Sequence, residues 1–201
     1  MSDGRTQPNL VVKHIVDNFF MFGFGSEESA LLQCVKELVE NSIDASRVGQ
    51  IGATKGRVRV CIAVSSTVDP PQQLLTIEVE DEGSGMRDPQ DMLRCFTTDK
   101  TTSAGGGAGG VTMTGRFGVG LSTCFLYSLE RTRVPMRVMT KHREAQMAVI
   151  ADFDLDAQLN PTVVQSGRIA VGVPSGTTIR IHLPINPSTR TQTLNRGTCV
   201  R

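Results

Sequence analysis

The chain has 201 residues, which is enough for one domain with a substantial apolar core. Hydrophobic residues make up 39% of the sequence and charged residues 20%, as is typical of a soluble globular protein. The formal net charge is only +1, which excludes a basic surface spread over the whole domain. None of the five cysteines forms a C-x-x-C pair, so we expect reduced thiols and no zinc site.

The N-terminal part of the chain predicts helices. Residues 1–9 are polar and are expected to be loosely ordered, and the apolar stretch at 10–24 predicts a short helix followed by a turn. Ser26 and the two glutamates after it are typical of a helix start. They predict a longer helix over residues 29–48, which ends at Gly49.

Two strands and a short helix are expected next. Alternation of apolar and polar residues predicts strands over 57–64 and 74–80, separated by a Pro-Pro turn. Residues 88–96 predict a short helix, and Pro89 is acceptable in its first turn. The glycine-rich stretch at 97–117 could be a flexible linker between two domains. It runs directly into an apolar helical pattern at 119–129, which favours a loop within one domain.

The C-terminal part predicts strands. They are expected near residues 134–140, 146–153, 167–173 and 177–183. Helices come mostly early and strands mostly late, which predicts the α+β class, with helices packed on one mixed, mainly antiparallel sheet. We expect a domain over residues 1–184, with residues 185–201 as a polar tail or the start of a further segment.

Polar residues cluster on one face of the predicted helix at 29–48. At 100° per residue, Glu37, Asn41 and Asp44 lie within about 60° of one another. The apolar residues fan out over the rest of the helix, so we expect the polar cluster to lie opposite the buried face; they are Leu31, Leu32, Val35, Leu38, Val39 and Ile43. A solvated face is the ordinary explanation. However, asparagine is a poor residue for a helix interior, and its oxygen with nearby carboxylates suits Mg²⁺ and the activation of water.

A turn containing two glycines follows the predicted strand at 74–80. Asp81 stands at the strand end, and Gly83, Gly85 and Met86 follow in the sequence DEGSGM. Glycines let the backbone turn sharply and approach a flat ligand. The aspartate can accept a hydrogen bond from an exocyclic amine such as that of adenine. An ordinary surface turn has the same composition, so this motif alone leaves both interpretations open.

A second glycine-rich motif opens the apolar helical pattern at 119–129. The sequence GRFGVGL (residues 115–121) exposes backbone N–H groups at a helix N-terminus, which favours phosphate binding. It is not a P-loop, because Leu121 stands where that motif requires lysine. It is not a dinucleotide-binding fingerprint either, since Thr123 replaces the third glycine.

Together these motifs resemble those of the GHKL (Bergerat-fold) ATPase superfamily. KELVENSIDA (36–45), VEDEGSGM (79–86) and GRFGVGL are similar to its N box and its first and second glycine boxes, and SGTTIRI (175–181) is similar to its final Gly-Thr box. Within the superfamily, GLSTCFLYS (120–128) and TRVPMRVMT (132–140) look most like the topoisomerase VI B subunit. The resemblance covers about residues 15–183.

The resemblance implies a two-layer α/β sandwich that binds ATP and Mg²⁺ beneath a mobile lid. It implies Glu37 as the general base, Asn41 as the Mg²⁺ ligand and Asp81 as the adenine acceptor, with Thr177 in the water network beside it. The implied nucleotide-binding residues are Asn41, Asp44, Ala45, Asp81, Gly83, Gly85, Met86, Lys100, Gly115, Arg116, Phe117, Gly118, Val119, Gly120, Leu121 and Thr177.

The resemblance also implies a partner and a cellular setting. The expected activity is that of an ATPase module of a type IIB topoisomerase or its meiotic relative. ATP would drive homodimerisation and gate DNA transport or cleavage by an A-type subunit. Such a protein is intracellular, in the nucleus of a eukaryote or the cytoplasm of a prokaryote, with no membrane partner. The family takes a catalytic lysine from a following transducer domain, so weak turnover is expected of this chain alone.

Other functions remain open at this point. A nucleotide-dependent dimerisation clamp without hydrolysis is one alternative, although the presence of Glu37 favours an enzyme. A GHKL ATPase of the chaperone or mismatch-repair type is another. Direct DNA contact is a further hypothesis, because basic residues alternate with apolar ones and would share one face of a strand; they are Arg131, Arg133, Arg137, Lys141 and Arg143.

Overall fold

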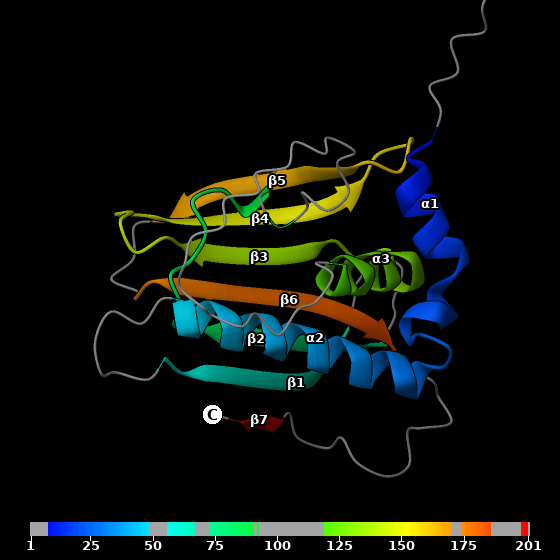
Figure 1. Cartoon of the computed structure of the whole chain (residues 1–201), viewed down its shortest axis with the longest axis horizontal. Coiled ribbons are helices and arrows are strands. Elements are labelled where there is room, and N and C mark those ends of the chain that lie inside the picture. The colour runs from blue at the N-terminus through cyan, green and yellow to red at the C-terminus, as the bar shows by residue number, and fades with distance from the viewer. Residues whose placement is uncertain are drawn as a thin grey trace, which may run out of the picture.

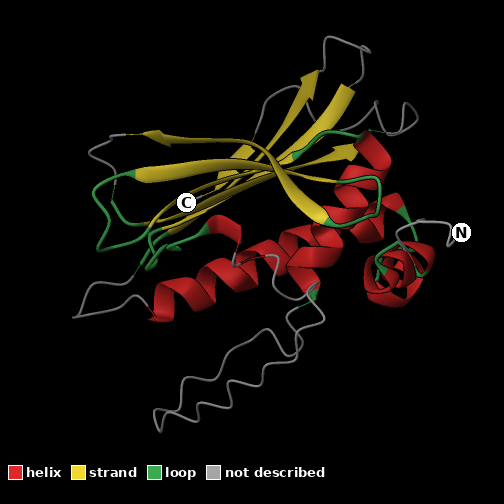
Figure 2. Cartoon of the chain, turned by 90° about the horizontal axis from the view of Figure 1, so that it is seen from above, coloured by secondary structure: helices red, strands yellow, loops and turns green. Residues whose placement is uncertain are grey.

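The computed structural model describes residues 8–48, 56–66, 73–90, 92, 119–169, 174–185 and 198–200. They form two layers, with all the helices on one face of a single sheet (Figures 1 and 2). The helices are α1 (Leu10–Asp17), the 3-10 helix η1 (Phe19–Phe22), α2 (Glu27–Val48) and α3 (Gly120–Thr132). The strands are β1 (Val58–Ser66), β2 (Gln73–Asp81), β3 (Met136–Lys141), β4 (Ala148–Leu155), β5 (Pro161–Ile169), β6 (Gly176–Pro184) and β7 (Thr198–Val200). The predicted α+β sandwich is confirmed.

The strand order joins distant parts of the sequence. It runs β5-β4-β3-β6-β2-β1-β7, and every described pair is antiparallel. A parallel pair, which a mixed sheet would contain, is therefore not found among the described strands. β6 lies between β2 and β3 (Figure 1), so it connects the β1–β2 hairpin to the β3–β4–β5 meander. The register places Asp81 of β2 opposite Thr177 of β6.

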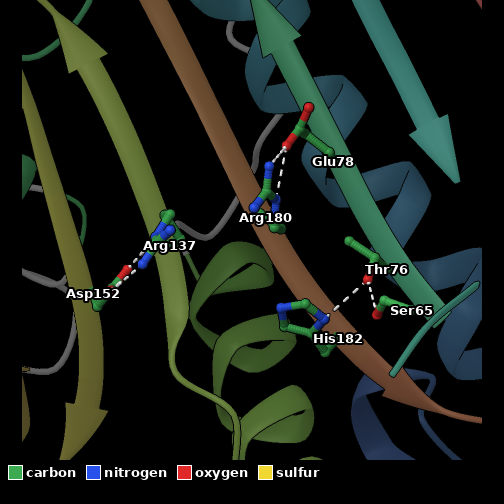
Figure 3. A network of polar contacts seen from close by, with 7 residues as sticks. All are labelled: Ser65, Thr76, Glu78, Arg137, Asp152, Arg180 and His182. Atoms are coloured by element: carbon green, nitrogen blue, oxygen red, sulfur yellow. Dashed lines mark hydrogen bonds and ion pairs between the residues drawn. The ribbon is translucent and has the colours of Figure 1, made fainter. Parts of the chain in front are cut away.

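The two faces of the sheet differ in chemistry because side chains alternate along each strand. On β2, Leu75, Ile77 and Val79 are buried against the helices. The opposite face carries a network of polar and charged side chains (Figure 3). There Arg180 of β6 pairs with Glu78 of β2 at 2.5 Å, and Arg137 of β3 pairs with Asp152 of β4 at 2.7 Å.

Helix α2 is rotated relative to the sequence prediction. Its buried line is one residue per turn, at Ala30, Cys34, Leu38, Ser42 and Ser46. Leu32, expected on the buried face, is 71% exposed. The reason is that α2 packs against α3 as well as against strands β1, β2 and β6. Its buried side therefore faces both the sheet and the neighbouring helix. The polar cluster therefore borders the buried line and does not lie opposite it.

Helix α3 is the most buried helix that the structure describes. Its residues from Ser122 to Leu129 are all buried between the sheet and the other helices. Tyr127 packs edge-on against Phe19 with ring centroids 5.2 Å apart, which connects α3 to η1. Among the described residues, none of the helices is long and apolar enough to cross a membrane.

Three local predictions differ from the structure. β5 spans Pro161–Ile169, earlier than the predicted strand at 167–173, because it is an edge strand whose C-terminal half is exposed and lacks apolar alternation. β7 forms within the segment expected to be a polar tail, and it pairs with β1. Cys34 and Cys124 are free as expected, but Cys61 is disulfide-bonded.

Candidate functional site

Asp81 ends β2 and lies among donors from three elements. Its Oδ1 atom accepts the backbone N–H of Gly83 at 2.9 Å and that of Thr177 at 3.3 Å. The hydroxyl of Ser42, on α2, donates to the same carboxylate. Burial raises the pKa of Asp81 to about 6, although these three hydrogen bonds act in the opposite direction. The result is a buried acceptor whose charge changes close to neutral pH.

The glycine turn after Asp81 touches α2. A Cβ atom on Gly83 would stand 2.8 Å from the carbonyl carbon and oxygen of Ala45, so the turn and the helix backbone are in contact. Asn41 directly precedes Ser42 and is partly buried. The first and second sequence motifs are therefore neighbours in space, with Asn41, Ala45, Asp81 and Gly83 around one corner of the sheet.

The other side of the turn rests on the end of β3. Gly85 has φ of +64°, and a Cβ atom there would overlap with the carbonyl of Lys141. Met86 donates its N–H to the hydroxyl of Thr140 at 2.8 Å, and Arg143 donates its N–H to the carbonyl of Ser84 at 2.9 Å. The backbone conformation and the contact with Lys141 therefore both require glycine at position 85. This requirement is independent of any ligand.

Glu37 lies one turn before Asn41 on α2, against the start of α3. Its Oε1 atom accepts from Nε2 of Gln33 at 2.7 Å and from Nζ of Lys36 at 3.1 Å. Its Oε2 atom lies where a Cβ atom on Gly120 would be. Asp44 lies on the same helix, 3.6 Å from Nη1 of Arg47. The polar cluster of α2 therefore extends from Asp81 to the first turn of α3.

The start of α3 is the described part of the second glycine motif. Val119 is the N-cap residue and has no side-chain capping bond, so the first N–H groups of the helix are not capped by its side chain. Gly120 and Leu121 form the first turn. The other predicted phosphate-binding residues, Lys100, Gly115, Arg116, Phe117 and Gly118, lie outside the described residues.

Two residues that sequence reasoning missed belong to this site, Ser42 and Thr140. Both are buried polar residues at positions where the surrounding pattern is apolar. Thr140 follows Met136 and Val138 on the helix-facing side of β3, and a hydroxyl in that series is a signal that the sequence contains. Ser42 similarly lies one turn after the buried Leu38.

The prediction that five basic residues share one face of a strand is wrong for three of them. Arg131 lies in α3 and Arg133 is the C-cap of that helix. Arg143 follows β3, so only Arg137 and Lys141 belong to the strand. Arg137 is engaged by Asp152, which raises the pKa of its guanidinium. The described strand therefore offers no continuous basic surface for DNA.

No group of three or more His, Cys, Asp or Glu residues in the described part of the chain could hold a metal ion by itself. An asparagine such as Asn41 could supply one oxygen ligand to Mg²⁺.

The sequence is similar to a known ATPase family over most of its length. The profile of the family described as histidine kinase-, DNA gyrase B- and HSP90-like ATPases matches residues 26–187. The B subunit of the type 2 DNA topoisomerase 6 of Sulfurisphaera tokodaii is 27% identical over 166 residues, which cover 80% of this chain and 29% of the relative. The corresponding protein of Saccharolobus solfataricus is 26% identical over 164 residues, covering 81% and 29%. This chain thus spans under a third of these curated relatives.

The fold is similar to that of a solved eukaryotic ATPase region. The ATPase region of Saccharomyces cerevisiae topoisomerase II aligns with a TM-score of 0.53 at 12% identity, covering 86% of this chain and 49% of that one. At this identity the likeness concerns the fold alone. Taken with the family profile and the convergence of the motifs on one corner of the sheet, it leads to one conclusion. The chain belongs to the family of histidine kinase-, DNA gyrase B- and HSP90-like ATPases.

Proposed function

We propose that the chain binds ATP between α2, the glycine turn and the start of α3, and that it hydrolyses it. The observation that carries this proposal is the environment of Asp81. A carboxylate that is 6% exposed, with Oδ1 used by two N–H groups, is a suitable acceptor for the exocyclic amine of adenine. Thr177 contributes its N–H to Asp81 and its hydroxyl to the same corner. Gly83, Gly85 and Met86 form the wall beside it.

The phosphates are assigned to the first turn of α3. The positive end of the helix dipole and its N–H groups favour an anion at Val119, Gly120 and Leu121. The resemblance to the ATPase superfamily adds Lys100, Gly115, Arg116, Phe117 and Gly118 to the proposed phosphate-binding residues. Asp44 and Ala45 line the nucleotide from α2. Asn41 would hold Mg²⁺ through its side-chain oxygen, and the ion would supply charge neutralisation during phosphoryl transfer.

Glu37 is the proposed general base. It takes a proton from a water molecule while the water oxygen forms a bond to the terminal phosphorus. The bond from that phosphorus to its bridging oxygen breaks, and the electron pair remains on ADP. The contact between Glu37 and Gly120 supports this role, because it brings the carboxylate next to the proposed phosphate site.

In the full assembly, ATP binding drives dimerisation of the chain and gates DNA transport or cleavage by an A-type topoisomerase VI subunit. The support is the similarity to the B subunits of type 2 DNA topoisomerase 6 from two archaea. DNA is thus a partner of the assembly in this proposal.

A clamp that binds ATP without productive hydrolysis is a second candidate. One observation favours it, namely that Lys36 contacts both Glu37 and Glu40, at 3.1 and 3.2 Å. These contacts raise the pKa of Lys36 and hold an ammonium group beside the proposed base. Gln33 and Lys36 both donate to Oε1 of Glu37, so this oxygen is already engaged and is less available to a water molecule.

Calorimetric titration with a non-hydrolysable ATP analogue and Mg²⁺ tests binding, and phosphate release tests turnover. We expect binding by the wild type, binding without turnover by Glu37→Ala, and loss of binding by Asp81→Ala. Lys36→Ala separates the two candidates, because faster phosphate release indicates an enzyme restrained by Lys36. Absence of binding by the wild type contradicts the proposal as a whole.

A further inference from the structure

Thr140 is a buried polar residue that the proposed chemistry does not use. It is only 1% exposed, on the side of β3 that faces the helices. Its neighbours on that side, Met136 and Val138, are apolar and fully buried. A hydroxyl in such surroundings is unfavourable unless its hydrogen bonds are made.

The hydroxyl of Thr140 has three partners. It accepts the N–H of Met86 at 2.8 Å. It lies 3.3 Å from the carbonyl of Gly176, to which it donates, and 3.0 Å from the hydroxyl of Thr177. One proton and two lone pairs serve all three when Thr177 donates to Thr140. The hydrogen-bonding capacity of Thr140 is then complete, with no donor or acceptor left for a ligand.

These partners belong to the two segments that flank Asp81. Met86 lies in the glycine turn that follows Asp81 along the chain. Gly176 and Thr177 begin β6, and Thr177 donates its N–H to Asp81 at 3.3 Å. A Cβ atom on Gly176 would overlap with the carbonyl of Asp81, so this end of β6 is also in contact with the backbone of β2. One hydroxyl on β3 therefore joins both segments.

The end of β3 provides further contacts to the same turn. Gly85 lies against the carbonyl of Lys141, and Arg143 donates its N–H to Ser84 at 2.9 Å. Arg87 and Glu144 form an ion pair across the same boundary. Of these contacts, the hydrogen bonds of Thr140 are the ones that extend to β6. The others hold the turn to the end of β3, which otherwise pairs with Gly176 and Thr177 through its backbone.

We propose that Thr140 is a positioning residue for recognition of the adenine base, acting through Met86 and Thr177 and not by touching the nucleotide. This inference rests on the proposed ATP-binding function. The spacing between the glycine turn and the start of β6 defines how Asp81 faces the base amine. Loss of the Thr140 hydroxyl loosens that spacing, so discrimination between adenine and guanine declines before phosphate binding does.

Calorimetry on the whole 201-residue chain tests this, with non-hydrolysable ATP and GTP analogues and Mg²⁺. Thr140→Val removes the hydroxyl at nearly constant volume, and Thr140→Ser retains it. We expect Thr140→Val to weaken binding of the ATP analogue about tenfold, as for one lost hydrogen bond, with binding of the GTP analogue unchanged. Thr140→Ser should retain the wild-type ratio. The matched control is Thr132→Val, because Thr132 is a buried threonine at the end of α3 that hydrogen-bonds Ser128 and Val134, and not Met86, Thr177 or Asp81.

The outcomes separate the two proposals. If the wild type binds the ATP analogue and Thr140→Val keeps the wild-type ratio of affinities, the role of Thr140 is overturned and the proposed function stands. An equal loss for both analogues also overturns it, because it indicates a merely structural role. No binding by the wild type contradicts the proposed function and removes this inference with it. If Thr140→Val does not fold, Thr140→Ala replaces it in the comparison with Thr140→Ser. The measured quantity is again the ratio of the affinities for the ATP and GTP analogues.

Discussion

The carboxylate of Glu37 and the α-carbon of Gly120 are in direct contact, although they belong to different helices. A side chain at position 120 would occupy the volume of Oε2. The requirement for glycine is therefore steric and is imposed by Glu37. At Gly85 a positive φ angle adds to a steric requirement, which is imposed there by the carbonyl of Lys141.

Gly120→Ala should impair both stability and nucleotide binding. The added methyl group must displace the carboxylate of Glu37 from Gln33 and Lys36, and the lost hydrogen bonds cost about 1 kcal/mol of unfolding free energy. Urea denaturation and calorimetric titration measure the two effects. Gly25→Ala is the control, because a Cβ atom there meets nothing within 4 Å. The double variant Gly120→Ala/Glu37→Ala should be at least as stable as Glu37→Ala, because the methyl group then displaces no carboxylate. A double variant less stable than Glu37→Ala would show that Glu37 is not the obstacle.

Asp81→Asn should stabilise the unliganded protein at neutral pH. Burial raises the pKa of Asp81 from 3.8 to about 6. Between these values the folded state keeps a proton that the unfolded chain has released, so stability decreases as pH rises through this window and is constant above it. The difference corresponds to at most about 3 kcal/mol, at about 1.4 kcal/mol per pKa unit.

The measurement is urea denaturation of both proteins at several pH values from roughly 3.5 to 7.5 in steps of about half a unit, a range that brackets the window. The gain from Asp81→Asn should be small at the acid end and reach its full value near about pH 6.5. A gain that does not vary with pH would contradict the assignment of the titration to Asp81.

Binding of the adenine base should release a proton near pH 6. In the proposed complex the base amine donates to the charged form of Asp81, whose pKa is about 6 before binding. About half a proton is then released near pH 6 and almost none at about pH 8. Titration with adenosine, which has no phosphate group, in two buffers of different ionisation enthalpy measures the release. Equal release at both pH values would exclude Asp81 as the acceptor.

The orientation of α2 can be tested with two leucines. Leu38 is fully buried, so Leu38→Ala should cost about 2–5 kcal/mol. Leu32→Ala should change stability by less than about 0.5 kcal/mol, because Leu32 is 71% exposed. Chemical denaturation of the two variants gives both values. Similar costs for the two would mean that the helix presents a different face to the sheet.

Much of the fold follows from local patterns in the sequence. The long helix, the β1–β2 hairpin and the start of α3 were predictable because apolar periodicity and glycine placement are local signals. Asp81 could be assigned to a strand end for the same reason. The ordered motifs indicated that distant segments meet, and the hydrogen bond from Ser42 to Asp81 is such a meeting.

Other features depend on packing that one sequence does not reveal. The buried line of α2 is displaced because α3 covers its side, and the sequence contains no local sign of that neighbour. Edge strand β5 has too little apolar alternation for its position to be predicted. Gln33 and Lys36 could not be connected to Glu37 without the coordinates, since their contacts depend on which rotamers the helix surface permits.

The position of β6 between β2 and β3 has a consequence for synthesis of the chain. On a ribosome, the N-terminal helices, β1 and β2 emerge before α3 and the meander, and β6 emerges after them. Until β6 emerges, β2 and β3 each have an exposed edge, and Asp81 lacks the hydrogen bond from the N–H group of Thr177. If nucleotide binds at Asp81 as proposed, a nascent chain that stops before β6 should gain less stability from nucleotide than the whole chain does, since ligands stabilise only the state that binds them.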